Sequence, residues 1–154
     1  MKLNYAVIPL IVLATAVIGG MITSRGMAWY KTIKKPLWTP PGAVIGVVWT
    51  FIFILSTLSA LIVWNFIPHG TRFWVIIVLF LLNALANIFW TYLFFGTHHM
   101  YAAIWEALFL EVTVLCLIEL TKAVSAGAAF LLLPYAAWVL FASYLTYRVW
   151  ALNK

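Results

Sequence analysis

Long apolar runs separated by short polar segments dominate the chain. Each run has about the 20 apolar residues that a helix needs to cross the hydrocarbon core of a bilayer. The pattern predicts an all-α integral membrane protein with a single domain over residues 1–154, a bundle of five transmembrane helices. The expected helices cover about residues 5–23, 43–66, 73–95, 101–120 and 126–150.

The connection between the first two runs, about residues 24–42, is the one long loop that the pattern predicts. It carries two tryptophans, Trp29 and Trp38, and a stiff end, because Pro40 and Pro41 fix φ and lack N–H donors. Loops of this length are usually functional. Two interpretations are open: the loop is a lid over a cavity, or its aromatic residues form a belt at the membrane interface.

Two features bear on the first and the fifth predicted helices. The first run continues past the length of a signal-peptide core, so we interpret it as a retained helix. Pro134 lies inside the fifth run and predicts a kink there, which membrane helices tolerate when neighbours satisfy the freed carbonyl group.

The composition agrees with a membrane protein: 67% of residues are hydrophobic and 8% are charged, too few charges to cover a soluble domain. The net charge is +6, and Arg25, Lys31, Lys34 and Lys35 all fall in the first loop. This clustering favours a basic collar at membrane lipid headgroups, with no nucleic acid as partner. With Cys116 as the single cysteine and three scattered histidines, we expect no disulfide within the chain and no metal site.

The basic residues also predict an orientation. With five spans the two termini lie on opposite sides of the membrane, and the side richer in Lys and Arg is cytoplasmic. The N-terminal side has Lys2, Arg72 and Lys122. The other side has Arg25, Lys31, Lys34, Lys35, Arg148 and Lys154. The N-terminus is therefore expected outside, and the first loop and the C-terminus in the cytoplasm.

Polar and aromatic side chains recur at helical spacing and predict inward faces on three helices. A buried asparagine amide needs a partner in hydrocarbon, so the asparagines must face the bundle interior. They either bond neighbouring helices together or contact a ligand. Such faces suit a flat, apolar ligand with polar edges. The faces are Trp49, Phe53 and Ser56; Asn83, Asn87 and Trp90; and Tyr135, Trp138, Ala142 and Thr146.

All three acidic residues, Glu106, Glu111 and Glu119, fall in the fourth run. We expect Glu119 to form an interfacial ion pair with Lys122. At about 100° per residue, Glu106 and Glu111 point some 140° apart, so they are not a catalytic pair, although either could serve a proton relay.

Small residues recur every four positions in the first run and predict close helix contact, within the chain or between two chains. They are Thr15, Gly19 and Thr23, and Ala16, Gly20 and Ser24.

Several motifs together resemble the TspO/MBR family, which includes bacterial tryptophan-rich sensory proteins and the mitochondrial translocator protein. They occur in the family's order and cover nearly the whole chain. They are Trp29-Tyr30, Lys35-Pro36-x-Trp38-Thr39-Pro40-Pro41-Gly42, Val48-Trp49-Thr50, Asn87-x-x-Trp90, Phe95-Gly96, Leu133-Pro134-Tyr135-x-x-Trp138 and Trp150-x-Leu152-Asn153.

The resemblance implies a first-loop lid over a cavity that binds porphyrins (protoporphyrin IX and haem) as ligands, with no obligatory cofactor. It also implies a homodimer and a carboxylate site at Glu106. Some members promote light-dependent breakdown of protoporphyrin IX, and the tryptophans implicated there match Trp49 and Trp138. This chain has Phe53 where the family usually has tyrosine. Ala151 replaces an arginine of the animal sterol motif, so sterol binding is the least expected property.

Three functions are therefore possible. The first is a receptor or carrier for porphyrins and related apolar ligands, with a role in tetrapyrrole transport, sensing or homeostasis. The second is an enzyme that degrades protoporphyrin IX in light, and the third is a proton-coupled transporter that uses an intramembrane glutamate. The receptor is the leading hypothesis. The expected ligand-binding residues are Trp29, Trp38, Pro40, Pro41, Trp49, Phe53, Asn83, Asn87, Trp90, Glu106, Tyr135, Trp138, Ala142 and Thr146.

Overall fold

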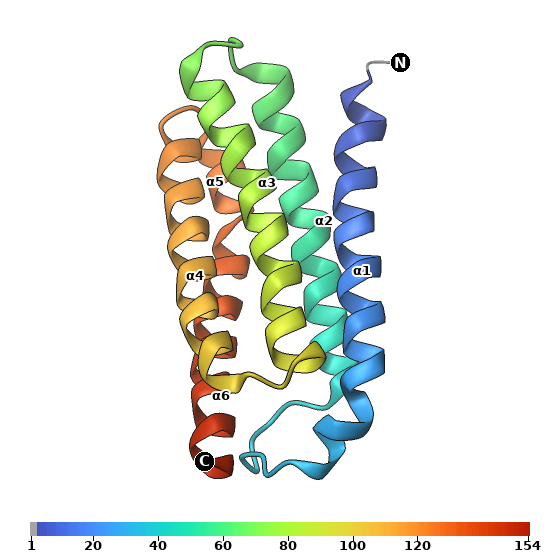
Figure 1. Cartoon of the computed structure of the whole chain (residues 1–154). Helices are drawn as coiled ribbons and strands as arrows, with labels where there is room; N and C mark the ends of the chain where they lie inside the picture. The colour runs from blue at the N-terminus through green and yellow to red at the C-terminus, as the bar shows by residue number, and fades with distance from the viewer. Residues whose placement is uncertain (1–2) are drawn as a thin grey trace.

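The computed structural model describes residues 3–154, so Lys2 lies outside the described residues. Within that range, five helical segments are long and apolar enough to cross a membrane, which confirms the predicted fold (Figure 1). The elements are α1 (Asn4–Thr32), α2 (Gly42–Phe66), α3 (Thr71–Thr91), the π-helical turn η1 (Tyr92–Gly96), α4 (Met100–Lys122), α5 (Ala126–Phe130) and α6 (Leu133–Asn153).

The first helix is longer than its apolar run. Its 29 residues correspond to about 43 Å at 1.5 Å per residue, whereas the hydrocarbon core is about 30 Å thick. The helix therefore continues beyond the expected end at residue 23, and the connection to α2 shortens from the expected residues 24–42 to residues 33–41. Trp29 consequently lies in α1 and not in the loop.

The fifth span is broken rather than kinked. α5 ends at Phe130, and α6 begins at Leu133 with Pro134 in its first turn. Proline is tolerated there because the first-turn N–H groups have no partner within the helix in any case. The break lets α5 pack against α2, where the Ser59 hydroxyl donates a hydrogen bond to the carbonyl oxygen of Ala128 at 2.9 Å.

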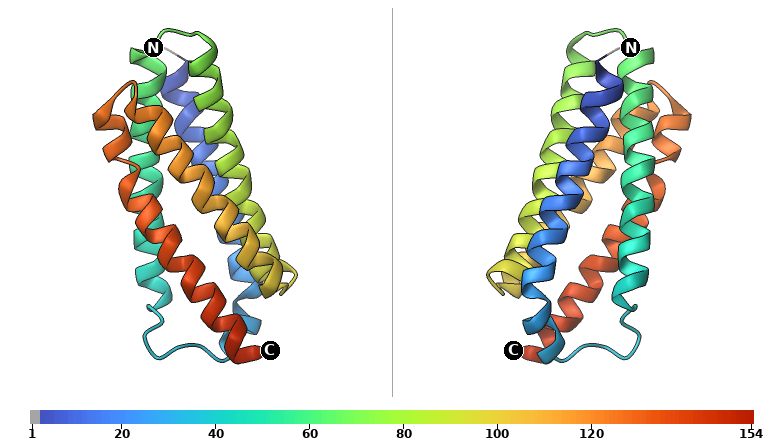
Figure 2. Two further views of the ribbon diagram at one scale, coloured as in Figure 1. Left: turned by 90° about the vertical axis from the view of Figure 1, so that its left-hand side faces the viewer. Right: turned by 90° about the vertical axis from the view of Figure 1, so that its right-hand side faces the viewer.

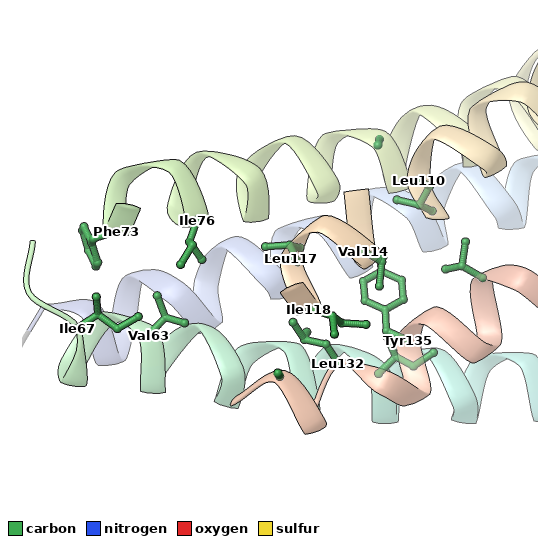
Figure 3. Packing of buried hydrophobic residues seen from close by; sticks show 14 residues of the cluster. Val63, Ile67, Phe73, Ile76, Leu110, Val114, Leu117, Ile118, Leu132 and Tyr135 are labelled. Carbon is green, nitrogen blue, oxygen red and sulfur yellow. The ribbon is translucent and has the colours of Figure 1, made fainter. Parts of the chain in front are cut away.

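The helices form a ring in the order α1, α3, α4, α6 and α2, and α1 also packs against α2. One end of the ring is solid, because α2, α3, α4 and α5 converge there on apolar side chains. Figure 3 shows this packing. Toward the other end, where the connection to α2 lies, α1 and α2 diverge and α6 is visible between them (Figure 2, right). The solid end is built from Val63, Ile67, Phe73, Ile76, Leu117, Ile118 and Leu132, among others.

α1 also makes one very close contact with the π-helical turn. Gly26 is buried, and a Cβ at this position would lie 2.8 Å from the Cβ of Phe95 and closer still to the Phe95 carbonyl oxygen. Only a residue without a side chain allows the two backbones to approach in this way. The contact fixes η1, and with it the C-terminal end of α3, against α1.

Candidate functional site

A cavity of about 460 Å³ occupies the half of the bundle near the α1–α2 connection. Helices α1, α2, α3, α4 and α6 and the turn η1 all contribute to its wall, mostly with apolar and small side chains. The wall residues are Thr15, Ala16, Gly19, Gly20, Thr23, Ser24, Met27, Tyr30, Gly42, Ile45, Gly46, Trp49, Thr50, Phe53, Asn87, Trp90, Thr91, Phe94, Phe95, Ala107, Leu110, Trp138, Val139, Phe141, Ala142, Leu145, Thr146 and Val149.

The wall includes half of the residues that the sequence predicted for ligand contact. Helical periodicity placed these side chains on inward faces, and the structure brings them together from three different helices around one space. They are Trp49, Phe53, Asn87, Trp90, Trp138, Ala142 and Thr146. Their contact with a ligand stays a prediction.

Asn83 and Tyr135 lie behind the wall, in a hydrogen-bond network that joins α3, α4 and α6. The Tyr135 hydroxyl donates to Asn83 Oδ1 at 2.8 Å and accepts from Asn87 Nδ2 at 3.2 Å. Asn83 Nδ2 donates to the Thr113 hydroxyl at 2.8 Å. The interpretation of the asparagines as bonds between helices therefore holds for Asn83, whereas Asn87 both joins this network and lines the cavity.

Two tryptophans of the cavity wall have indole N–H groups without a hydrogen-bond partner in the described part of the chain. The Nε1 atoms of Trp90 and Trp138 are buried and find no hydrogen-bond partner among residues 3–154. Neighbouring rings hold both indoles in place: Trp90 stacks on Phe94 with centroids 5.3 Å apart, and Trp138 lies 5.2 Å from Phe141. A buried N–H group without a partner is costly, so a hydrogen-bond acceptor in the cavity would be favourable.

Residues 33–41, which we call the strap, are fastened to α6. Asn153 bonds both backbone groups of one strap residue: Lys34 N–H donates to Asn153 Oδ1 at 2.9 Å, and Asn153 Nδ2 donates to Lys34 O at 2.8 Å. Trp38 stacks on Tyr144 with centroids 5.7 Å apart and meets Phe141 edge-on at 5.9 Å. The strap is thus held against α6, and none of its residues lines the cavity, so the lid interpretation stays a prediction. Its tryptophan packs against Phe141, which is a wall residue.

Trp29 at the end of α1 and the strap prolines Pro40 and Pro41, which were also predicted for ligand contact, lie outside the cavity wall. Trp29 stacks on His98 with centroids 4.1 Å apart, outside the cavity wall. Pro41 directly precedes α2 and accepts the first helical hydrogen bond from Ile45 N at 3.1 Å, and Pro40 lies before it in the strap.

The three glutamates lie in different environments. Glu106 is 8% exposed on the inner face of α4, beside but not on the cavity wall. Its Oε2 atom, like that of the half-buried Glu111, has no hydrogen-bond partner in the described part of the chain. The predicted ion pair is wrong: Glu119 and Lys122 are both exposed near the end of α4, and no salt bridge joins these two described residues.

The small residues of α1 were predicted to mark helix contact, within the chain or between two chains, and contact between chains stays a prediction. Both series predicted for helix contact, Thr15, Gly19 and Thr23 and also Ala16, Gly20 and Ser24, line the cavity. Their lack of bulk leaves space for the cavity, and Gly19 also lies close to Thr91 on α3. Asn153, by contrast, was recognised only as part of a motif, because a contact across 119 positions leaves no local signal.

Comparison with known proteins agrees with this architecture. The sequence profile of the TspO/MBR family matches residues 7–151. A tryptophan-rich protein TspO of Bacillus cereus is 37% identical over 128 residues, which is 81% of this chain and 80% of the relative. The same-named protein of Archaeoglobus fulgidus is 32% identical over 94% of this chain and 93% of the relative. The human translocator protein is 32% identical over 86% of this chain and 79% of the relative. The chain is a member of the TspO/MBR family of integral membrane proteins.

Proposed function

We propose that this protein is a membrane receptor or carrier that binds a porphyrin, such as protoporphyrin IX or haem, in the cavity beneath the strap. The observation that carries the proposal is the wall itself, on which Trp49, Trp90, Trp138 and Asn87 face one space of about 460 Å³. This volume falls within the range of about 300–1,000 Å³ that small-molecule sites occupy. The proposed role is tetrapyrrole transport, sensing or homeostasis.

The chemistry of the wall suits a flat aromatic ligand with polar edges. Indole and phenyl faces offer stacking area, which favours a planar ring system over a compact one. The buried, unpaired N–H groups of Trp90 and Trp138 would donate to acceptor atoms at the ligand's edge once the rings turn toward the cavity. The polar residues of the wall are neutral, so recognition depends mainly on shape and stacking.

The two rival functions rest on different residues. Photodegradation would use Trp49 and Trp138, both of which lie on the wall and so would touch the bound ring. A proton-coupled transporter would use Glu106 or Glu111, neither of which lies on the wall. The geometry favours the receptor and keeps photodegradation as the second candidate.

Orientation and assembly are part of the proposal. The end of α1, the strap and the end of α6 together carry six of the nine basic residues, which supports placing this end in the cytoplasm and the start of α1 outside. A homodimer remains a proposal, and each chain provides a complete cavity of its own.

A fluorescence titration tests the receptor and enzyme functions together. Purified protein in lipid nanodiscs is titrated with protoporphyrin IX in the dark, and the same samples are then illuminated and assayed for porphyrin loss. Trp138→Phe keeps a stacking face but removes the indole N–H, so binding should weaken by about 0.5–1.5 kcal/mol. The matched control is Trp105→Phe, because Trp105 is 60% exposed on the outside of α4.

The outcomes separate the candidates. If the wild type binds but loses porphyrin no faster than empty nanodiscs, the receptor function stands and the enzyme function fails. If photodegradation occurs and Trp138→Phe abolishes it while binding persists, the enzyme function stands. Equal affinities for Trp138→Phe and Trp105→Phe would contradict a role for the tryptophan wall.

A further inference from the structure

The cavity wall is open along the seam between α1 and α2. Several residues on this seam line the cavity and are also exposed: Gly20 and Ser24 on α1, and Gly42, Gly46 and Thr50 on α2. The two helices diverge here toward the strap (Figure 2, right). We call this gap, bounded by these five residues, the window.

Three glycines line the window. A Cβ placed on Gly20, Gly42 or Gly46 would meet no atom of residues 3–154 within 4 Å, apart from its two chain neighbours and the nearby backbone of its own helix. The contrast with Gly26, which α1 uses for a very tight contact with Phe95, shows that these glycines do not serve packing. Three glycines with free space around them on two facing helices leave a passage.

The rim of the window is compatible with lipid. The Ser24 hydroxyl donates to Met21 O at 2.8 Å, and the Thr50 hydroxyl donates to Gly46 O at 2.9 Å. Both donors are therefore satisfied within their own helices, so the rim presents no unpaired hydroxyl hydrogen to the hydrocarbon. An apolar molecule crossing the rim would break no hydrogen bond between helices.

The strap, by comparison, is fastened to α6. Asn153 holds both backbone groups of Lys34, and Trp38 is stacked on Tyr144. Moving the strap requires breaking these contacts, whereas no hydrogen bond between the described residues of α1 and α2 crosses the window.

We propose that the cavity exchanges its ligand laterally with the bilayer, through the window between α1 and α2, while the strap stays fastened. The proposal rests on the proposed function of the cavity and narrows its ligand class to planar apolar molecules that partition into membrane hydrocarbon.

The test measures binding kinetics with protoporphyrin IX already dissolved in the membrane. Vesicles containing the porphyrin are mixed with vesicles containing the protein under fusion conditions, and tryptophan quenching is followed in time, in both association and competition-driven release. Gly46→Phe narrows the window. Its matched control is Val47→Phe, because Val47 is 70% exposed and points away from the cavity on the same helix.

Lateral exchange predicts that Gly46→Phe slows association and release together, each by about tenfold or more, while Val47→Phe changes neither by more than about twofold. A similar fall in the association and release rates, with the affinity unchanged, indicates that the substitution narrows the route by which the ligand enters and leaves. A weaker affinity with an unchanged association rate would mean that the new ring only fills the cavity, and this result would overturn the proposal.

A second pair of variants tests the strap end. Asn153→Ala removes the fastening of Lys34, and Leu152→Ala is its exposed neighbour control. Lateral exchange predicts association rates within about twofold of wild type for both variants. A clear acceleration by Asn153→Ala alone would show entry under the strap and overturn the window. If the wild type shows no quenching at all, the proposed receptor function fails instead, so the two failures are distinguishable.

Discussion

The hydroxyl of Tyr135 is the centre of the buried polar network, and its removal has a calculable cost. Tyr135→Phe deletes the bond to Asn83 Oδ1 at 2.8 Å and the bond from Asn87 Nδ2 at 3.2 Å, while leaving the ring in place. Hydrogen bonds between membrane helices are worth about 0.6 kcal/mol on average and up to about 1.7 kcal/mol. Two lost bonds therefore predict a loss of about 1–3 kcal/mol in the free energy of unfolding.

The matched control is Tyr144→Phe. The Tyr144 hydroxyl accepts one bond from Arg148 Nη1 at 3.2 Å on the exposed side of α6, so its loss should cost less than about 0.5 kcal/mol. Equilibrium unfolding in mixed micelles measures both variants under the same conditions. Equal losses for the two variants would refute the view that the network supports the bundle.

A double-mutant cycle sharpens this test. If Tyr135 and Asn83 interact directly, Tyr135→Phe should cost much less when Asn83 is already replaced by alanine, with a coupling energy of about 0.5–1.5 kcal/mol. Strictly additive losses would show that the bond contributes nothing measurable.

Three further predictions concern packing, charge and topology. Gly26→Ala should destabilise the protein by about 1–3 kcal/mol because the new methyl group collides with Phe95, whereas Gly20→Ala should be neutral or slightly stabilising. Thermal unfolding compares the two variants, and equal unfolding midpoints would contradict the close contact at Gly26. Glu119→Gln should leave ligand affinity within about twofold in a binding titration, because this exposed carboxylate has no ion pair with Lys122. A reporter fused after Lys154 should be active only if it works in the cytoplasm, and activity of a periplasmic reporter there would reverse the orientation.

The fold was predictable because its signals are local. Hydropathy alone locates five spans, and helical periodicity places Trp49, Phe53 and Trp138 on inward faces. The end of α1 was not predictable from hydropathy, because the helix continues to Thr32 through polar residues that still favour helix formation. Apolar character marks the membrane, not the helix boundary.

The site was predictable only in part, for two physical reasons. Inward-facing polar residues can meet either a cavity or each other, and only the packing of α4 and α6 decides that Asn83 and Tyr135 bond to each other behind the wall. Small residues on α1 have the same ambiguity, since a glycine allows close contact at Gly26 and free space at Gly20. Whether a polar residue meets a cavity or another side chain, and whether a glycine meets a helix or free space, depends on the neighbouring helix, which the sequence of one helix does not specify.

Filling the cavity is the most direct test of the central claim that a porphyrin binds within it. Ala142→Trp places a large side chain on the cavity wall, and Ala137→Trp places the same side chain on the exposed face of α6. Both variants are titrated with protoporphyrin IX in nanodiscs, with isothermal calorimetry as the readout because it does not depend on tryptophan emission. Occupancy of the cavity predicts at least about a tenfold loss of affinity for Ala142→Trp and wild-type affinity for Ala137→Trp. Wild-type affinity in both variants would show that the porphyrin binds elsewhere.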